Sequence, residues 1–289
     1  MRRAFAVKMD TVFKTLKKDV ILFDGGMGTE LMKRLGKPEI SPWENLLHPE
    51  TVVGIHKDYC AAGCDVLTAN TFGAYALKAR GRFDADAAAR RAIGNAQAAL
   101  SAFPDKKRLI ALDVGSLGAL IEPYGDLSET EAFDNFARLI KSGAGADFIC
   151  IETMSDLNEC RIALEAARAA GGLPVVVSMT FDERGRTFMG ATIEQFAELA
   201  GAFRVAAAGF NCGLPPEKFP PLVREWKRRS GLPLIVRPNA DAATAVEDFA
   251  KEAAALVEAG VPVIGGCCGT GPEHIKALRE RLRELRIEN

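Results

Sequence analysis

Eight short apolar runs, each followed by a segment with helical spacing, constrain the fold of this 289-residue chain more than any other feature. The runs are continuously apolar rather than alternating, which is typical of parallel strands buried on both faces. The sixth run is mostly alanine, and its spacing from its neighbours is the main reason to include it. The runs are residues 20–23, 65–68, 109–112, 148–151, 175–178, 205–208, 234–236 and 261–264.

The segments between the runs carry recognisable helix ends. Three capping boxes are predicted, at Ser128-x-x-Glu131, Asp156-x-x-Glu159 and Thr192-x-x-Gln195. Three helices are predicted to end at a left-handed glycine, namely Gly36, Gly63 and Gly260. Apolar side chains at helical spacing predict a helix over residues 245–259.

Eight strands alternating with helices over about 250 residues predict a (β/α)8 TIM barrel, formed by residues 1–289 as a single domain. A doubly wound open sheet is the alternative fold. That fold would be favoured by a Gly-x-Gly-x-x-Gly turn after the first strand, and Gly25-Gly26-Met27-Gly28 does not fit the pattern. Residues 1–18 are predicted to form an extra N-terminal helix that plugs or flanks the bottom of the barrel.

Composition excludes several classes of protein. The formal net charge is −1 and no basic stripe is present, so nucleic-acid binding is not expected. No apolar run approaches the roughly 20 residues that cross a bilayer, so no membrane association is expected either. The first 18 residues are charged throughout, unlike a secretory signal. Seven cysteines are an odd number for a disulfide framework, which predicts free thiols and a cytoplasmic location.

Polar and glycine-rich residues follow the runs, at the end of the barrel where active sites lie. These segments are Asp24–Thr29, Asn70–Gly73, Asp113–Ser116, Glu152–Thr153, Met179–Thr180, Asn211–Gly213, Arg237–Asn239 and Gly265–Thr270. None of the three histidines lies among them, so a Ser-His-Asp or Cys-His arrangement would lack its base.

The cysteines at two of these strand ends point to a metal site. Cys212 ends the sixth strand, and Cys267 and Cys268 end the eighth, so the three can meet at one ion. Three thiolates without a fourth protein ligand are typical of an open Zn²⁺ site, whose free position suits a substrate thiol. Coordination would deprotonate that thiol, so no catalytic residue distinct from the metal site is predicted. The alternatives are three structural core cysteines or a vicinal disulfide.

The adjacent cysteines need an unusual backbone. Neighbouring residues in a regular strand point to opposite faces, so the chain must kink if Cys267 and Cys268 are to face one ion. The glycines at 265, 266 and 269 are expected to supply the necessary conformational freedom.

Two carboxylates, Asp24 and Glu152, follow the first and fourth runs and are expected to point into the mouth of the barrel. With no obvious partner, they suit an ammonium group on the substrate. Helix capping or loop hydrogen bonds are the structural alternative, and paired acid/base catalysis has no further support. The amides of Gly25 and Gly26, just before a helix, are placed to hold a carboxylate. Together these groups would recognise an amino acid.

Four motifs in order along the chain closely resemble the homocysteine S-methyltransferase family. They are Asp24-Gly25-Gly26-Met27-Gly28-Thr29-Glu30-Leu31, Asn70-Thr71-Phe72-Gly73, Gly209-Phe210-Asn211-Cys212 and Gly265-Gly266-Cys267-Cys268-Gly269-Thr270. The likeness is greatest to the homocysteine-binding module of cobalamin-dependent methionine synthase. Family members that use S-methylmethionine tend to have an arginine where Gly269 stands.

The resemblance implies specific roles for the motif residues. Cys212, Cys267 and Cys268 would bind Zn²⁺, with the homocysteine thiol as fourth ligand. Asp24 and Glu152 would bind the homocysteine ammonium, and the Gly25 and Gly26 amides its carboxylate. Asn70 and Thr71 are counted with the substrate-binding residues. The expected reaction is in-line attack of the thiolate on an activated methyl group, which yields methionine.

Two departures from the family bear on the methyl donor. The family usually has a glycine and a longer loop after Pro238-Asn239-Ala240, whereas here Asp241 follows and a helix begins almost at once. The chain also has no room for the folate, cobalamin and reactivation modules of full methionine synthase, and no Asp-x-His-x-x-Gly stretch. Methylcobalamin is therefore expected only in trans, on a separate corrinoid protein, unless the sequence is a fragment of a larger synthase.

Two other functions stay open. The first is a homocysteine methyltransferase that uses S-methylmethionine or betaine. The second is a non-catalytic thiol- or metal-binding barrel, which the short loop after Asn239 favours but the intact cysteines, Asp24 and Glu152 oppose.

Overall fold

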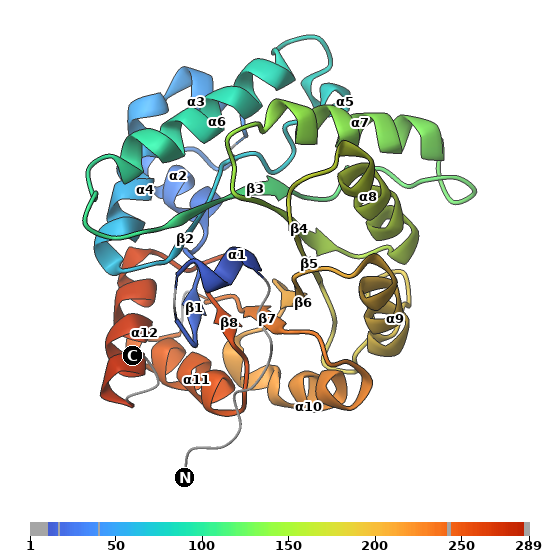
Figure 1. Ribbon diagram of the computed structural model, residues 1–289. Helices are drawn as coiled ribbons and strands as arrows, with labels where there is room; N and C mark the ends of the chain where they lie inside the picture. Colours follow the sequence, from blue (N-terminus) through green and yellow to red (C-terminus); the bar gives the residue numbers. More distant parts are fainter. Residues whose placement is uncertain (1–10, 17, 40, 242–243, 286–289) are drawn as a thin grey trace.

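Eight parallel strands alternate with helices around a barrel in the computed structural model, which describes residues 11–16, 18–39, 41–241 and 244–285 (Figure 1). The strands are β1 (Ile21–Leu22), β2 (Val66–Thr68), β3 (Leu109–Val114), β4 (Phe148–Met154), β5 (Val175–Met179), β6 (Ala207–Asn211), β7 (Leu234–Arg237) and β8 (Val263–Ile264). The TIM barrel predicted from the apolar runs is confirmed.

The strands are hydrogen-bonded in the order β1-β8-β7-β6-β5-β4-β3-β2, and the ring closes where β1 meets β2. Asp65 N–H donates to Leu22 O at 2.7 Å, and Asp24 N–H donates to Val66 O at 3.1 Å. A parallel bridge pairs Phe23 with Val66 at the same place. These contacts join β1 to β2 and leave no open sheet edge at that seam.

Helices surround the strands. They are α2 (Met27–Leu35), α3 (Glu44–Leu47), α4 (Pro49–Ala62), α5 (Ala76–Ala79), α6 (Ala85–Leu100), α7 (Glu129–Ser142), α8 (Leu157–Ala170), α9 (Ile193–Phe203), the 3-10 turn η1 (Pro216–Lys218), α10 (Pro220–Arg229), α11 (Val246–Glu258) and α12 (Pro272–Glu284). In the part of the chain that is described, no helix is both long and apolar enough to cross a membrane.

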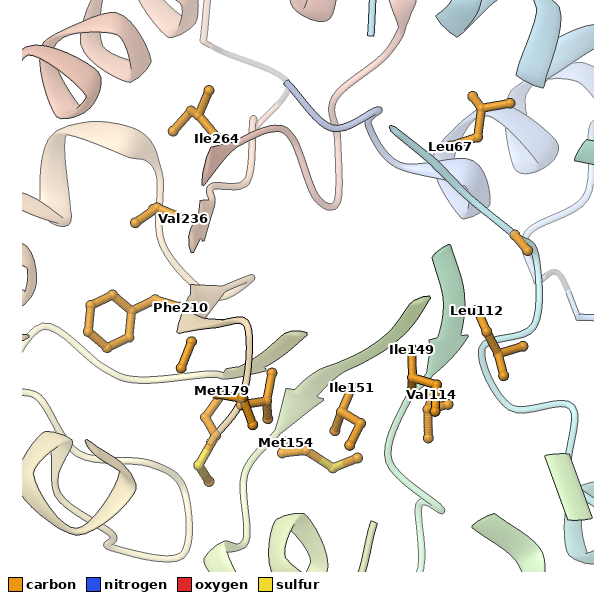
Figure 2. Close-up of a cluster of buried hydrophobic side chains, with 14 of the residues drawn as sticks. Leu67, Leu112, Val114, Ile149, Ile151, Met154, Met179, Phe210, Val236 and Ile264 are labelled. Atoms are coloured by element: carbon orange, nitrogen blue, oxygen red, sulfur yellow. The ribbon is translucent and has the colours of Figure 1, made fainter. Parts of the chain in front are cut away.

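Two apolar clusters hold the barrel together. The larger one lies between the strands and the outer helices, and Figure 2 shows its members around the outside of the strands, among them Leu112, Ile151 and Phe210. The smaller cluster fills the barrel interior with alternate residues of the strands, such as Ala111, Phe148 and Ile235. This two-sided burial explains why the runs are continuously apolar.

The extra N-terminal helix is short within the described residues. Helix α1 (Thr11–Lys14) lies across the barrel opening in Figure 1. Phe13 is fully buried, packs edge-on against Phe148 at 5.7 Å and belongs to the interior cluster. The predicted plug is therefore present over this turn, while residues 1–10 and 17 of the predicted 1–18 helix lie outside the described residues.

Most predicted helix ends are confirmed, with one exception. Capping boxes are present at Ser128 and Thr192, and the glycines at 36, 63 and 260 have φ of 63°, 97° and 91°. The box predicted at Asp156 is wrong, because Asp156 caps Asn158 N–H. Glu159 instead accepts from Leu117 N–H at 2.7 Å and from Ser116 Oγ, since it faces the loop after β3.

Candidate metal and substrate site

A layer of polar side chains lies above the apolar filling of the barrel. Its members stand two or four residues after interior apolar residues of the same strands, so the two-residue period points them to the same side. We call Thr68, Asp113, Glu152, Ser178, Asn211 and Arg237 the polar layer. All six are buried.

The three predicted cysteines meet beside this layer. The Sγ atoms of Cys212, Cys267 and Cys268 all lie within 4.8 Å of one another, and Cys212 Sγ is 3.8 Å from Cys268 Sγ. Cys267 is buried, Cys212 is half-buried and Cys268 is exposed, so the cluster opens towards the mouth of the barrel. Asn211 Nδ2 lies 3.7 Å from Cys267 Sγ. The strand positions thus predicted the cluster correctly.

The backbone kink that brings the cysteines together arises only partly where it was expected. Gly269 has φ of 81° and Cys212 itself has φ of 61°. Gly265 and Gly266 are not among the residues with positive φ, so the left-handed backbone belongs to Gly269 and Cys212. Gly265 and Gly266 are needed for close packing, because a Cβ would come within 2.6 Å of Phe23 Cβ at Gly265 and within 2.2 Å of Thr270 Oγ1 at Gly266.

The short segment after β7 packs directly on the cysteine loop. Pro238 O accepts from Cys267 N–H at 2.8 Å, and Ala240 N–H donates to Cys268 O at 2.9 Å. A Cβ at Gly269 would lie 1.6 Å from Ala240 O. The segment therefore braces the thiols, and a larger residue at position 269 has no room.

Hydrogen bonds within the thiol cluster make its members unequal. The Cys267 and Cys268 thiols lower the pKa of Cys212 to about 2, whereas the contact with Cys212 raises the pKa of Cys267 well above its usual value. Asn239 also hydrogen-bonds Cys212.

Asp24 and Glu152 do have a partner, contrary to the sequence-based prediction. Arg237 Nη1 donates to Glu152 Oε2, and Arg237 Nη2 lies 3.4 Å from Asp24 Oδ1. The third guanidinium nitrogen, Nε, donates to Gly266 O at 3.0 Å. Asp24 also accepts from Thr68 N–H and Thr68 Oγ1, both at 2.7 Å. A buried guanidinium thus joins the ends of β1, β4, β7 and the segment after β8.

Burial governs the ionisation of this group. Desolvation raises the pKa of Asp24 from 3.8 to about 6, against the opposing effect of Arg237. It also raises the pKa of Glu152. Burial alone would disfavour a charged Arg237, but Glu152 and Asp24 raise its pKa further above its usual value. Arg237 is therefore charged, while its carboxylates ionise less readily than in water.

The amides at the start of α2 are only partly available. Gly26 N–H already donates to Thr270 O at 2.9 Å, because Thr270 folds back over this turn. The prediction that Gly26 offers a free amide is therefore wrong. No described residue accepts from Gly25 N–H.

Asn70 and Thr71 have different environments. Asn70 lines the site, and its buried Nδ2 has no partner among the described residues. Thr71 is fully buried and donates to Asp113 O at 2.7 Å. Thr71 is not among the residues that line the cavity, and its side chain links the segments after β2 and β3.

A cavity of about 810 Å³ connects these groups to solvent. The residues that line it include Gly25, Asn70, Phe72, Lys78, Asp113, Glu152, Cys212, Arg237, Cys267 and Cys268, but not Asp24. Asp113 and Arg237 stand at strand ends in the sequence without a predicted role, and no sequence motif points to Lys78. The two-residue alternation of β3 and β7 would have indicated that the first two point inwards.

Comparison with known proteins agrees with this geometry. The homocysteine S-methyltransferase family profile matches residues 21–282. The chain belongs to the homocysteine S-methyltransferase family.

Similar members of the family differ in size and source. A homocysteine S-methyltransferase of Zea mays is 28% identical over 92% of the chain and 90% of its own length. A methionine synthase of Mycobacterium tuberculosis is also 28% identical, over 94% of the chain but only 25% of its own length. The metallated form of the Escherichia coli homocysteine methyltransferase MmuM is 25% identical, with a TM-score of 0.82 over 94% of this chain and 100% of that one.

Proposed function

We propose that this member of the homocysteine S-methyltransferase family is a zinc-dependent enzyme that methylates homocysteine to methionine, with a methylcorrinoid on a separate protein as donor. The observation that carries the proposal is the convergence of Cys212, Cys267 and Cys268 at the mouth of a cavity lined by acidic and amide groups.

The donor set fits zinc. Three sulfur atoms within 4.8 Å of one another can bind one ion, and thiolates favour Zn²⁺ over the harder cations. No fourth described protein ligand belongs to the cluster, so one position is left for substrate. When bound, zinc would keep the homocysteine sulfur in its nucleophilic thiolate form.

The cavity offers complementary groups to both ends of an amino acid. Asn70 Nδ2 is a buried donor without a partner, and Gly25 N–H at the start of α2 is a second donor for a carboxylate. Glu152 lines the cavity as part of the polar layer and can accept from an ammonium group. An unpaired buried polar group destabilises the folded protein. These groups therefore favour a ligand that carries both a carboxylate and an ammonium group.

The proposed reaction is a displacement at carbon. The homocysteine sulfur attacks the methyl carbon in line, so that the sulfur–carbon bond forms as the bond to the donor breaks. The donor keeps the electron pair, and the thiol proton leaves to solvent through the open mouth. The protein residues hold the thiol and the amino acid in place, which supplies the positioning part of catalysis.

The size of the cavity supports a donor that approaches from outside. About 810 Å³ exceeds what one small amino acid fills, so the mouth stays open above the substrate. Gly269 has no space for the arginine typical of S-methylmethionine-dependent members. The plant methyltransferase and the methionine synthase are both 28% identical to the chain, so sequence identity does not distinguish between methyl donors. An assay with each donor does.

The test is methionine formation from homocysteine by the zinc-loaded protein, with methylcobalamin, S-methylmethionine and betaine offered separately. Methylcobalamin, free or on a corrinoid protein, is expected to give product. Product from S-methylmethionine or betaine alone would establish the alternative donor class. No product from any donor, with zinc and homocysteine bound, would favour a non-catalytic thiol-binding barrel.

A further inference from the structure

We propose that Asn211 is a positioning residue for the thiol cluster: its side-chain amide donates an N–H···S hydrogen bond to Cys267 and links that sulfur to the cavity wall at Thr153. This inference rests on the zinc-dependent function proposed above. It assigns a role to the residue that precedes Cys212 in the sequence and whose side chain contacts a different cysteine of the cluster.

The orientation of the Asn211 amide follows from its partners. Oδ1 lies 2.9 Å from the backbone nitrogen of Thr153, and a backbone N–H can only donate, so the atom that faces it must be the oxygen. Oδ1 also accepts from Ser178 Oγ at 2.8 Å. The nitrogen therefore lies on the other side, where it donates to Thr153 Oγ1 at 2.7 Å and to Cys267 Sγ at 3.7 Å.

This amide uses every hydrogen-bonding position that an asparagine side chain has. Two donors meet its oxygen and two acceptors meet its nitrogen, and the residue is fully buried. Rotation of the amide would leave several buried polar groups unpaired. The N–H group of Asn211 is therefore held in one direction, towards the sulfur of Cys267.

Cys267 is the buried thiol of the cluster, so it depends on the protein for a donor. Three thiolates outweigh the charge of one Zn²⁺, and the negative charge that remains is costly away from water. An N–H group directed at a thiolate stabilises this charge, and such partners of metal ligands also orient them. Pro238 O already holds the Cys267 backbone by accepting from its N–H, so Asn211 acts on the side chain.

The same amide holds a strained residue in the wall of the cavity. Thr153 lines the cavity with φ of 61°, where the register of β4 against β5 shifts between Ile151 and Met154. A β-branched residue rarely adopts this left-handed conformation, so the surrounding contacts must maintain it. Asn211 supplies two of them, to the backbone N–H and to the hydroxyl group. One side chain thus fixes the cavity wall relative to Cys267.

The experiment compares metal binding by wild type, Asn211→Asp and Ser178→Ala. Asn211→Asp keeps an oxygen for Thr153 N–H and Ser178 Oγ, but places a second oxygen instead of an N–H donor beside Cys267. Its zinc affinity, measured by competition with a chelator, should fall about 10- to 100-fold. The sulfur-to-cobalt charge-transfer band of the Co²⁺-loaded variant should move to longer wavelength, because a thiolate without its donor gives up an electron more easily.

Two further variants separate the hydrogen bond to sulfur from general damage to the site. Ser178→Ala, the matched control, removes a partner of the same amide but leaves its N–H group on Cys267. Its zinc affinity should change less than about 2-fold, with the cobalt band unmoved. Asn211→Leu removes the donor without adding a charge and should change both measurements in the same direction as Asn211→Asp. Circular dichroism confirms that each variant is folded.

Wild type alone provides a further measurement. In cadmium-loaded protein, NMR should show scalar coupling between the cadmium nucleus and a side-chain amide proton of Asn211, transmitted through the sulfur of Cys267. Absence of this coupling, unchanged metal binding in both Asn211 variants, or equal changes in Ser178→Ala would overturn the inference and leave the proposed function standing. Wild type that binds neither zinc nor cobalt through sulfur would refute the proposed function and this inference with it.

Discussion

Nη2 of Arg237 lies 3.4 Å from Oδ1 of Asp24 at the top of the barrel interior, with both side chains at most 3% exposed. The same guanidinium donates to Glu152 and to Gly266 O. One buried cation therefore holds the ends of several strands around the cavity.

Replacing Arg237 should destabilise the barrel strongly. Arg237→Met would leave Asp24 and Glu152 buried without their cation, and a broken buried ion pair costs about 3–5 kcal/mol. Urea unfolding measures the effect. The control is Arg229→Met, whose partners Glu194 and Glu225 lie at the surface, so its loss of stability should be much smaller. Equal losses of stability in the two variants would contradict the role of Arg237 in joining the strand ends.

Stability should fall as the pH rises from about 4 to about 6. Because burial raises the pKa of Asp24 from 3.8 to about 6, the folded protein retains a proton that the unfolded chain has lost. The stabilisation is complete below the unfolded pKa and is lost as the pH passes the folded one, by about 3 kcal/mol in all for Asp24. Urea unfolding at several pH values should show a smaller fall for Asp24→Asn than for wild type. The same slope in both proteins would contradict the raised pKa.

Gly269→Ala should disturb the cysteine loop rather than only the local backbone. The new Cβ would lie 1.6 Å from Ala240 O, in addition to the strain of φ at 81°. Gly36→Ala is the matched control, since Gly36 is left-handed with φ of 63° but has open space around it. The control should lose about 1–2 kcal/mol and keep its zinc. Gly269→Ala should lose more stability and bind zinc more weakly, as measured by unfolding and competition with a chelator.

Removing one thiol of the cluster should remove the metal. Cys212→Ser is expected to reduce zinc from about one ion per chain to near zero in metal analysis. Cys160→Ala, in a fully buried cysteine of α8, should retain zinc. Full zinc content in Cys212→Ser would show that the three thiols are not the site.

The fold and the cysteine cluster were predictable because they depend on local patterns and on counting strands. Continuous apolar runs identify strands buried on both faces, and a run ending in Cys212 or Cys267 must deliver its thiol to the barrel mouth. The structure also corrects the bounds of the strands. Strand β6 begins at Ala207 rather than at residue 205, and β4 continues to Met154.

The partners within the site were not predictable from the same patterns. The carboxylates that pair with Arg237 are set by how far the arginine side chain reaches across the barrel. The order of the strands does not give this distance. Thr270 folding back onto Gly26 N–H, and Thr71 turning to Asp113 O, are likewise contacts between segments distant in sequence. Arg237 and Asp113 were visible as strand-end residues, but only the folded barrel shows that one is paired and the other is not.

The most direct test of the proposed function is zinc-edge X-ray absorption of the zinc-loaded protein, with and without homocysteine. Three sulfur ligands at about 2.3 Å and one lighter ligand are expected in the free protein, and four sulfur ligands once homocysteine is added. An unchanged spectrum on addition of homocysteine, or zinc held by fewer than three sulfur atoms, would contradict the proposed function.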